Sequence, residues 1–258
     1  MPTNRRNAWI RRLVPAPEAA IRLVCLPHAG GSAGAFFGLA TDLAPDVEVL
    51  AVQYPGRQDR IAEPPLERLG DLAEGVITAL LAERPGRYAI LGHSMGAALA
   101  FEVARRSAGR LPEPEIVVAS ACPPPGTVRR PGQLVHRLDD AAVVAELTRI
   151  GGSDGALLSE PDLLPLILPS VRADFHAVET YQPPAGSTVA CPIAAFTGDR
   201  DVRVDAAQAA GWDTYTTGGF ALHTFPGGHF YLQDPASGFT ERLRAVLSVG
   251  RPSTTVGS

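Results

Sequence analysis

The chain has 258 residues and a formal net charge of −4, and its hydrophobic and charged fractions, 45% and 19%, are ordinary for a globular protein. A chain of this length can bury one full core, so we predict a single domain over residues 1–258. The modest negative charge and the lack of a basic patch argue against DNA and RNA as partners, and no apolar stretch is long enough to span a bilayer.

Both ends of the chain are predicted to carry little packed structure. Residues 1–12 contain four arginines but no uninterrupted apolar core of the kind that an export signal needs. We therefore expect a disordered start, then an edge strand over 9–13, and at the other end a disordered tail over 251–258. The three cysteines are far apart and lie in or next to predicted strands, which indicates buried, reduced thiols in a cytoplasmic protein: Cys25, Cys122 and Cys191.

A glycine-rich loop, Pro27-His28-Ala29-Gly30-Gly31-Ser32, follows a buried strand that we predict over 21–26. Its glycines let backbone N–H groups approach a substrate carbonyl, so we predict that the Ala29 N–H is one donor of an oxyanion hole. A nucleotide-binding loop would also follow a strand, but the spacing here is not Gly-x-Gly-x-x-Gly. The next strand, over 47–52, also ends in Gln53-Tyr54 and lacks the acidic residue that would hold a ribose.

A Gly-x-Ser-x-Gly pentapeptide occupies 92–96, between a compact apolar strand over 88–91 and a helix-forming segment that ends near Gly109. Strand, sharp turn and helix in this order form the nucleophile elbow of an α/β-hydrolase, which lifts one serine above the sheet. The elbow predicts Ser94 as the nucleophile and the N–H of Met95 as the second oxyanion donor. The pentapeptide alone would also fit a tight turn with an ordinary serine, so its flanking strand and helix decide between the two.

Residues 123–190 form an insertion that is too long for a simple crossover between two strands. Within it we predict a helix over 141–150, capped by Asp139-Asp140, and a second helix that starts at Asp162 and is bent by Pro169. The insertion would be a mobile lid over the serine, with an apolar underside that contacts acyl groups. The alternative is an ordinary cover for one edge of the sheet.

A base and an acid that orients it should follow the serine, on loops just past strand ends. One predicted strand ends in Gly198-Asp199-Arg200-Asp201, where the spacing from the glycine favours Asp201 and leaves Asp199 as the alternative. His229 is the predicted base because it lies in a glycine-flanked loop between the last strand, over 220–225, and the last helix. The other histidines precede the serine, lie in the insertion or lie within a strand: His28, His93, His136, His176 and His223. His93 should point away from the substrate.

As a set, these motifs resemble the discrete type II thioesterases that accompany modular polyketide and nonribosomal peptide synthases. The resemblance covers about residues 9–249, and the segment 168–175 with Glu179-Thr180-Tyr181 resembles the lid helix of that family. One departure is Val202, which follows the acid where the family pattern has proline. The matching pieces are Pro27-His28-Ala29-Gly30-Gly31-Ser32, Tyr54-Pro55-Gly56-Arg57, Gly92-His93-Ser94-Met95-Gly96, Gly198 with Asp201, and Gly228-His229-Phe230.

The resemblance implies an α/β-hydrolase fold with a mostly parallel central sheet, flanking helices and a helical lid. It also implies that the enzyme removes acyl groups from the phosphopantetheine arm of an acyl or peptidyl carrier protein, in an editing role. We expect a monomer with no cofactor and no metal. The alternatives are a medium-chain fatty-acyl thioesterase or a small-ester carboxylesterase with the same triad and, more remotely, a binding module that performs no catalysis.

Carrier proteins are usually acidic, so this resemblance also implies a basic docking site near the mouth of the pocket. Two groups of arginines could supply it, and for each group the alternative is an ordinary solvated surface. They are Arg129, Arg130 and Arg137 at the entrance of the insertion, and Arg57 and Arg60 after the Tyr-Pro-Gly turn.

Overall fold

A central sheet organises the computed structural model, which describes residues 7–127, 134–151, 160 and 162–248. Within these residues the sheet has seven strands in the order β1-β3-β2-β4-β5-β6-β7. β1 pairs antiparallel with β3, and every other neighbouring pair is parallel. The strands are β1 (Ile10–Arg12), β2 (Ile21–Leu26), β3 (Val47–Val52), β4 (Tyr88–His93), β5 (Val117–Ser120), β6 (Ile193–Gly198) and β7 (Phe220–Phe225).

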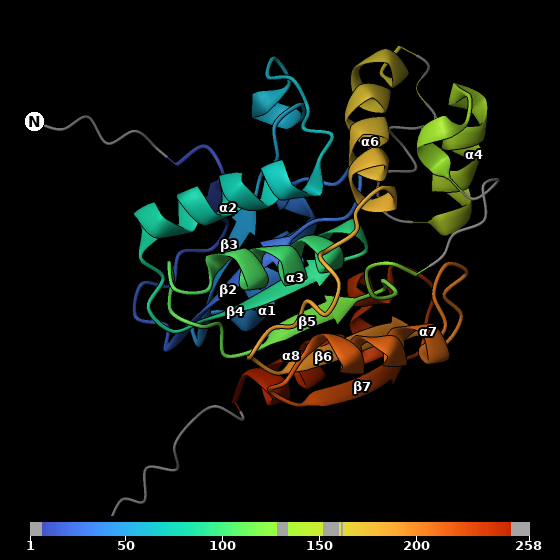
Figure 1. Cartoon of the computed structure of the whole chain (residues 1–258). Helices are drawn as coiled ribbons and strands as arrows, with labels where there is room; N and C mark the ends of the chain where they lie inside the picture. Colours follow the sequence, from blue (N-terminus) through green and yellow to red (C-terminus); the bar gives the residue numbers. More distant parts are fainter. Residues whose placement is uncertain (1–6, 128–133, 152–159, 161, 249–258) are drawn as a thin grey trace, which may run out of the picture.

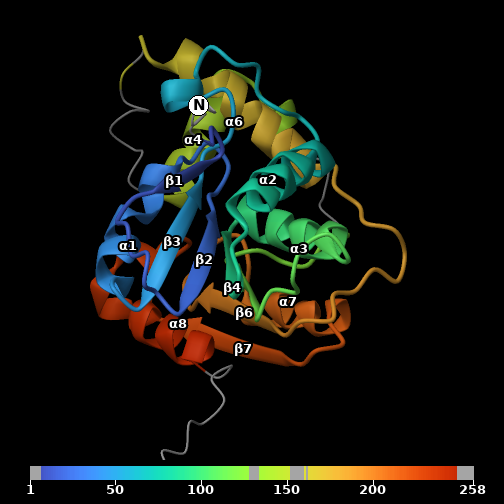
Figure 2. The same cartoon turned by 90° about the vertical axis from the view of Figure 1, so that its left-hand side faces the viewer.

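Helices cover both faces of this sheet, which explains why its central strands are almost continuously apolar. α2, α3 and α7 lie on one face, and α1 and α8 lie on the other (Figures 1 and 2). α4 and α6 lie beyond the carboxyl ends of the parallel strands (Figure 1). The helices are α1 (Phe37–Leu43), α2 (Leu69–Glu83), α3 (Met95–Ser107), α4 (Asp140–Ile150), α6 (Leu164–Glu179), α7 (Ala206–Ala210) and α8 (Phe239–Ser248).

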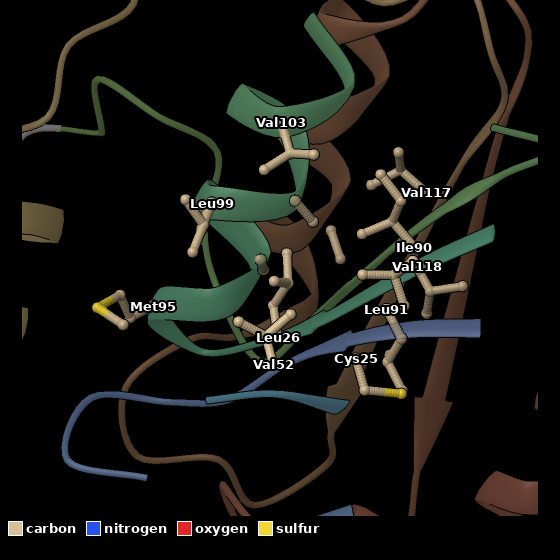
Figure 3. Close-up of a cluster of buried hydrophobic side chains, with 14 of the residues drawn as sticks. Cys25, Leu26, Val52, Ile90, Leu91, Met95, Leu99, Val103, Val117 and Val118 are labelled. Carbon is tan, nitrogen blue, oxygen red and sulfur yellow. The ribbon is translucent and has the colours of Figure 1, made fainter. Parts of the chain in front are cut away.

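One cluster of buried hydrophobic side chains lies between α3 and the middle of the sheet (Figure 3). Leu99 and Val103 of α3 lie over the strands that carry Leu26, Ile90 and Val117, and all five side chains are buried (Figure 3). Since α3 starts immediately after the elbow, this packing fixes the helix that presents the predicted nucleophile.

The structure confirms the predicted α/β-hydrolase class and most of the predicted strands. The edge strand expected over 9–13 is β1, and Cys25, Cys122 and Cys191 are all buried and are not joined by a disulfide. The predicted disordered start and tail fall largely on residues 1–6 and 249–258, which lie outside the described residues. Among the described helices, none is both long and apolar enough to cross a membrane.

The insertion contributes two long helices to the described structure. α4 begins as expected: the Asp139 side chain accepts a hydrogen bond from the Ala142 N–H at 2.8 Å, and Gly151 ends the helix. α6 begins at Leu164, two residues after the predicted start, and has no side-chain cap. It continues through Pro169 as one helix.

Candidate active site

The elbow holds Ser94 in a backbone conformation that few side chains adopt, with φ of 55° and ψ of −120°. A Cβ added to Gly92 would lie 1.9 Å from the Gly96 carbonyl oxygen, and one added to Gly96 would lie 2.0 Å from the carbonyl oxygen of Leu26. Both positions therefore require glycine, because any side chain would collide with backbone. The Ser94 N–H donates to the carbonyl of Ser120 on β5 at 2.8 Å, which fixes the turn against the sheet.

Two loops past the ends of β6 and β7 bring the predicted acid and base together. Nδ1 of His229 lies 2.8 Å from Oδ2 of Asp201, and both side chains are almost fully buried. The other carboxylate oxygen of Asp201 accepts the Arg203 N–H at 2.8 Å, so the acid is held from both sides. The sequence left Asp199 as an alternative acid, but its side chain is 47% exposed and accepts the Gly227 N–H at 2.8 Å. Asp199 thus joins the two loops, while Asp201 contacts the imidazole.

The environment of the His229 imidazole favours its neutral form, which is the form that can accept a proton. Burial lowers the pKa of His229 below its ordinary value, and this effect outweighs the hydrogen bond and the negative charge of Asp201, which both raise it. The hydrogen bond from Nδ1–H to the carboxylate leaves Nε2 as the proton acceptor.

A second buried imidazole, that of His93, packs against the imidazole of His229. The ring centroids of His93 and His229 are 5.3 Å apart, and His93 is absent from the lining of the cavity described below, as expected for a residue that points away from substrate. Nδ1 of His93 is 2.9 Å from the Ser120 hydroxyl, which is 2.6 Å from the Tyr231 hydroxyl. Burial, and to a lesser degree His229 and His28, lower the pKa of His93 well below its ordinary value, so the ring is neutral.

The sequence did not predict this chain of side chains, because its members are distant in the sequence. Tyr231 follows the motif Gly228-His229-Phe230 directly, and that position was the one available signal.

The two predicted oxyanion donors lie at the carboxyl ends of neighbouring strands, β2 and β4. Met95 is the first residue of α3, so its N–H is outside the hydrogen-bond ladder of the helix. Ala29 is buried in the loop after β2 and lines the same cavity as Ser94 and His229.

That cavity has a volume of about 230 Å³ and is closed on one side by the insertion. One end of the cavity is lined by the predicted catalytic residues Ser94 and His229, together with His28 and Ala29. Its opposite walls are mostly apolar and come from α4 and α6, which suits a hydrocarbon chain better than a charged group. The wall residues are Leu147, Thr148, Ile150, Leu166, Ile167, Ser170, Val171 and Phe175, with Ile61 and Phe230.

One predicted docking group is wrong. The Arg57 side chain is 6% exposed and forms an ion pair with Asp174. Arg60 is buried, bonds to Glu63 and to the carbonyl of Gln53, and lies 4.7 Å from the ring centroid of Trp9. Both guanidinium groups are therefore buried and bound to other residues of the chain, so they do not form a basic docking surface.

The other group falls mainly outside the described residues. Arg129 and Arg130 belong to the undescribed segment 128–133, and Arg137 is exposed. Among the described residues, no cluster of three or more His, Cys, Asp or Glu side chains could hold a metal ion.

Comparisons with known proteins agree on one family. A family model described as a thioesterase domain matches residues 21–247. The thioesterase PikA5 of Streptomyces venezuelae is 48% identical over 230 residues, which cover 88% of this chain and 80% of that protein. A probable cadicidin biosynthesis thioesterase of Streptomyces griseus is 43% identical over 226 residues, covering 87% of this chain and 62% of that protein. The solved structure of BorB, a type II thioesterase from the borrelidin biosynthetic cluster, superposes with a TM-score of 0.84 at 43% identity, covering 93% and 98% of the two chains.

Proposed function

The chain belongs to the thioesterase family, and from that premise we propose that it hydrolyses acyl groups from the phosphopantetheine arm of acyl or peptidyl carrier proteins. Its role is editing: it clears stalled or wrongly primed acyl units from a polyketide or nonribosomal peptide synthase. The names of the similar proteins support this role, since they come from antibiotic and related biosynthetic clusters.

The observation that carries the catalytic assignment is the buried contact between Asp201 and His229, because His229 lines the same cavity as Ser94. Oγ of Ser94 attacks the thioester carbonyl carbon while Nε2 of His229 takes its proton, and Asp201 holds the tautomer and stabilises the imidazolium. The N–H groups of Ala29 and Met95 stabilise the tetrahedral oxyanion, at about 2.7–4 kcal/mol for each donor in comparable sites.

The reaction then proceeds through an acyl-enzyme in two stages. The carbon–sulfur bond breaks, and the pantetheine sulfur leaves with the proton from His229, so an acyl group remains on Ser94. His229 next deprotonates a water molecule that attacks this ester, and the second collapse returns the proton to Oγ of Ser94 and releases the free acid. No cofactor or metal enters either step.

The insertion over 123–190 contributes the acyl-binding wall. The apolar side chains that α4 and α6 present to the cavity support this role. We propose a monomeric enzyme located in the cytoplasm. The cytoplasmic location is supported by three buried cysteines that form no disulfide with one another.

The test is a mass-spectrometric hydrolysis assay on acetyl, propionyl and long-chain acyl carrier proteins, with a matched free thioester and a simple oxygen ester. We expect release that depends on Ser94, is lost to background in Ser94→Ala, and is faster from the carrier than from the free thioester. A Ser94→Ala protein that keeps a substantial share of the wild-type turnover would refute the nucleophile. Faster turnover of the oxygen ester than of any thioester would indicate a carboxylesterase, and a strong preference for long chains would indicate a fatty-acyl thioesterase.

A further inference from the structure

Helix α6 lies directly against the oxyanion loop, which we define as residues 27–32. Gly30 has a φ of +79°, and a Cβ at this position would lie 2.9 Å from Cγ2 of Val171 on α6. The loop backbone therefore touches the helix with no room for a side chain between them. A shift of α6 toward or away from the sheet would therefore change the packing of this loop against Val171.

A buried carboxylate on the same helix binds the loop. Asp174 has no exposed side-chain surface, and its Oδ2 accepts the Gly30 N–H at 2.8 Å. Nη1 and Nη2 of Arg57 donate to Oδ2 and Oδ1 of Asp174 at 2.6 and 2.9 Å, and Nη1 also donates to the Gly31 carbonyl at 3.1 Å. One ion pair thus holds both the N–H of Gly30 and the carbonyl of Gly31.

This arrangement is poorly explained as a device for stability alone. Burying two charges costs desolvation energy that their attraction only roughly repays, so a buried ion pair is weak evidence for stabilisation. Its geometric effect is specific: the bond to Asp174 fixes the N–H of Gly30, the residue directly after the predicted oxyanion donor Ala29. Arg57 also neutralises a carboxylate that would otherwise oppose negative charge on a nearby oxyanion.

We infer that Asp174, together with Arg57, is a positioning residue for catalysis: it fixes the oxyanion loop to α6 so that the Ala29 N–H points at the developing oxyanion. The inference rests on acyl transfer at Ser94, as proposed above, but not on the sulfur of the substrate or on the carrier protein. On this basis α6 belongs to the catalytic framework, because it cannot leave the cavity without releasing Gly30.

The test is Asp174→Asn, measured with a thioester and with a p-nitrophenyl ester. Asparagine keeps one oxygen for the Gly30 N–H, but its NH2 group would face an N–H of Arg57, so the paired geometry that fixes the loop to α6 is lost. We expect kcat to fall by about 10²-fold, the size of effect seen when an oxyanion donor is lost or a reacting group is misplaced by about 1 Å. KM and the affinity for the product acid should change little. The affinity for a trifluoromethyl ketone, which forms a charged tetrahedral adduct with the serine, should fall by about the same factor as kcat/KM.

The matched control is Asp140→Asn. This substitution breaks the exposed ion pair between Asp140 of α4 and Arg172 of α6, and it should leave kcat and ketone affinity unchanged. Equal losses for Asp140→Asn and Asp174→Asn would overturn the inference, as would a fall in product affinity as large as the fall in ketone affinity.

Asp174→Asn leaves the charge of Arg57 buried without its partner and can therefore unfold the protein. The double variant Arg57→Met/Asp174→Leu removes both charges together with their hydrogen bonds to Gly30 and Gly31, and it should lose kcat to the same extent. Hydrogen–deuterium exchange of the peptide over 27–34 provides a readout without substrate, and we expect faster exchange in the double variant. Wild-type exchange together with wild-type kcat would overturn the inference.

These results remain separable from those on the proposed function. A wild-type protein that cleaves only the oxygen ester disproves the thioesterase proposal, yet the effect of Asp174→Asn on the p-nitrophenyl ester still decides the inference.

Discussion

Asp201 and Asp199 lie two residues apart in one turn, and replacing each with asparagine should have very different effects. Asp201 is fully buried with its Oδ2 2.8 Å from Nδ1 of His229, whereas Asp199 is half-exposed and bonds to the backbone. Asp201→Asn presents an amide in place of the carboxylate and so favours the wrong imidazole tautomer, an effect of about 10⁴-fold on kcat in a comparable triad. At about 1.36 kcal/mol for each tenfold change, this corresponds to about 5.4 kcal/mol of transition-state stabilisation.

Asp199→Asn keeps an oxygen that can accept the Gly227 N–H, so we expect a loss of stability of at most about 1 kcal/mol and a kcat within threefold of wild type. The measurement is kcat and KM for both variants on an acyl thioester, with thermal denaturation to confirm folding. The pH profile gives an independent check on Asp201. Because the hydrogen bond and charge of Asp201 both raise the pKa of His229, their removal should move the residual activity limb to lower pH.

The reasoning fails if Asp201→Asn keeps more than a tenth of the wild-type kcat, or if Asp199→Asn loses as much activity as Asp201→Asn. The first result would mean that the negative charge of Asp201 contributes little to catalysis. The second would mean that Asp199 is as important for activity as Asp201, although it does not contact the imidazole.

Three further predictions concern the pH dependence of activity, substitutions at two glycines and the pH dependence of stability. The profile of kcat/KM against pH should rise with a midpoint below about 6.5, because His229 must be neutral to act and burial lowers its pKa; a midpoint above 7 would contradict this. Gly96→Ala should cost several kcal/mol or prevent folding, since its Cβ would meet backbone at 2.0 Å, while Gly38→Ala, with open space around it, should be neutral or stabilising in thermal denaturation. The free energy of unfolding, measured by urea titration at pH 5 to 8, should fall as the pH falls below about 6.5. The reason is that His93 is protonated in the unfolded chain but stays neutral when it is buried in the folded protein. In His93→Gln the slope of this free energy against pH should shrink by up to about 1.36 kcal/mol per pH unit.

The fold could be predicted from sequence largely because its signals are local. The strands that became β2, β3 and β7 match their predicted bounds, since apolar runs flanked by turns determine them. The cap at Asp139 and the stop at Gly151 are equally local. The sequence predicts that α6 starts at Asp162, two residues too early, because an acidic residue before a helix predicts a cap that the tertiary structure does not use.

The candidate site was predictable only where its residues belong to motifs. The sequence predicts Arg57 to be a surface charge, because arginine is mostly exposed and its partner Asp174 lies 117 residues away. Nothing local in either segment marks the ion pair, which exists only because α6 folds back over the loop after β2. The contact between His93 and His229 escaped prediction for the same reason.

Arg203 connects Asp201 to α4, which forms part of the cavity wall, and this link matters for experiments that graft the insertion from a relative to change substrate preference. Its backbone N–H binds Asp201, while its guanidinium forms a 2.5 Å ion pair with Glu146 of α4. A chimera that imports the segment 123–190 from a relative would therefore keep residue 203 but could lose its partner at 146, in the same way that Arg57 could lose Asp174. Such grafts should keep each pair matched, residue 146 with residue 203 and residue 174 with residue 57. Otherwise the graft would leave a charged side chain without its partner close to Asp201 or to the loop after β2.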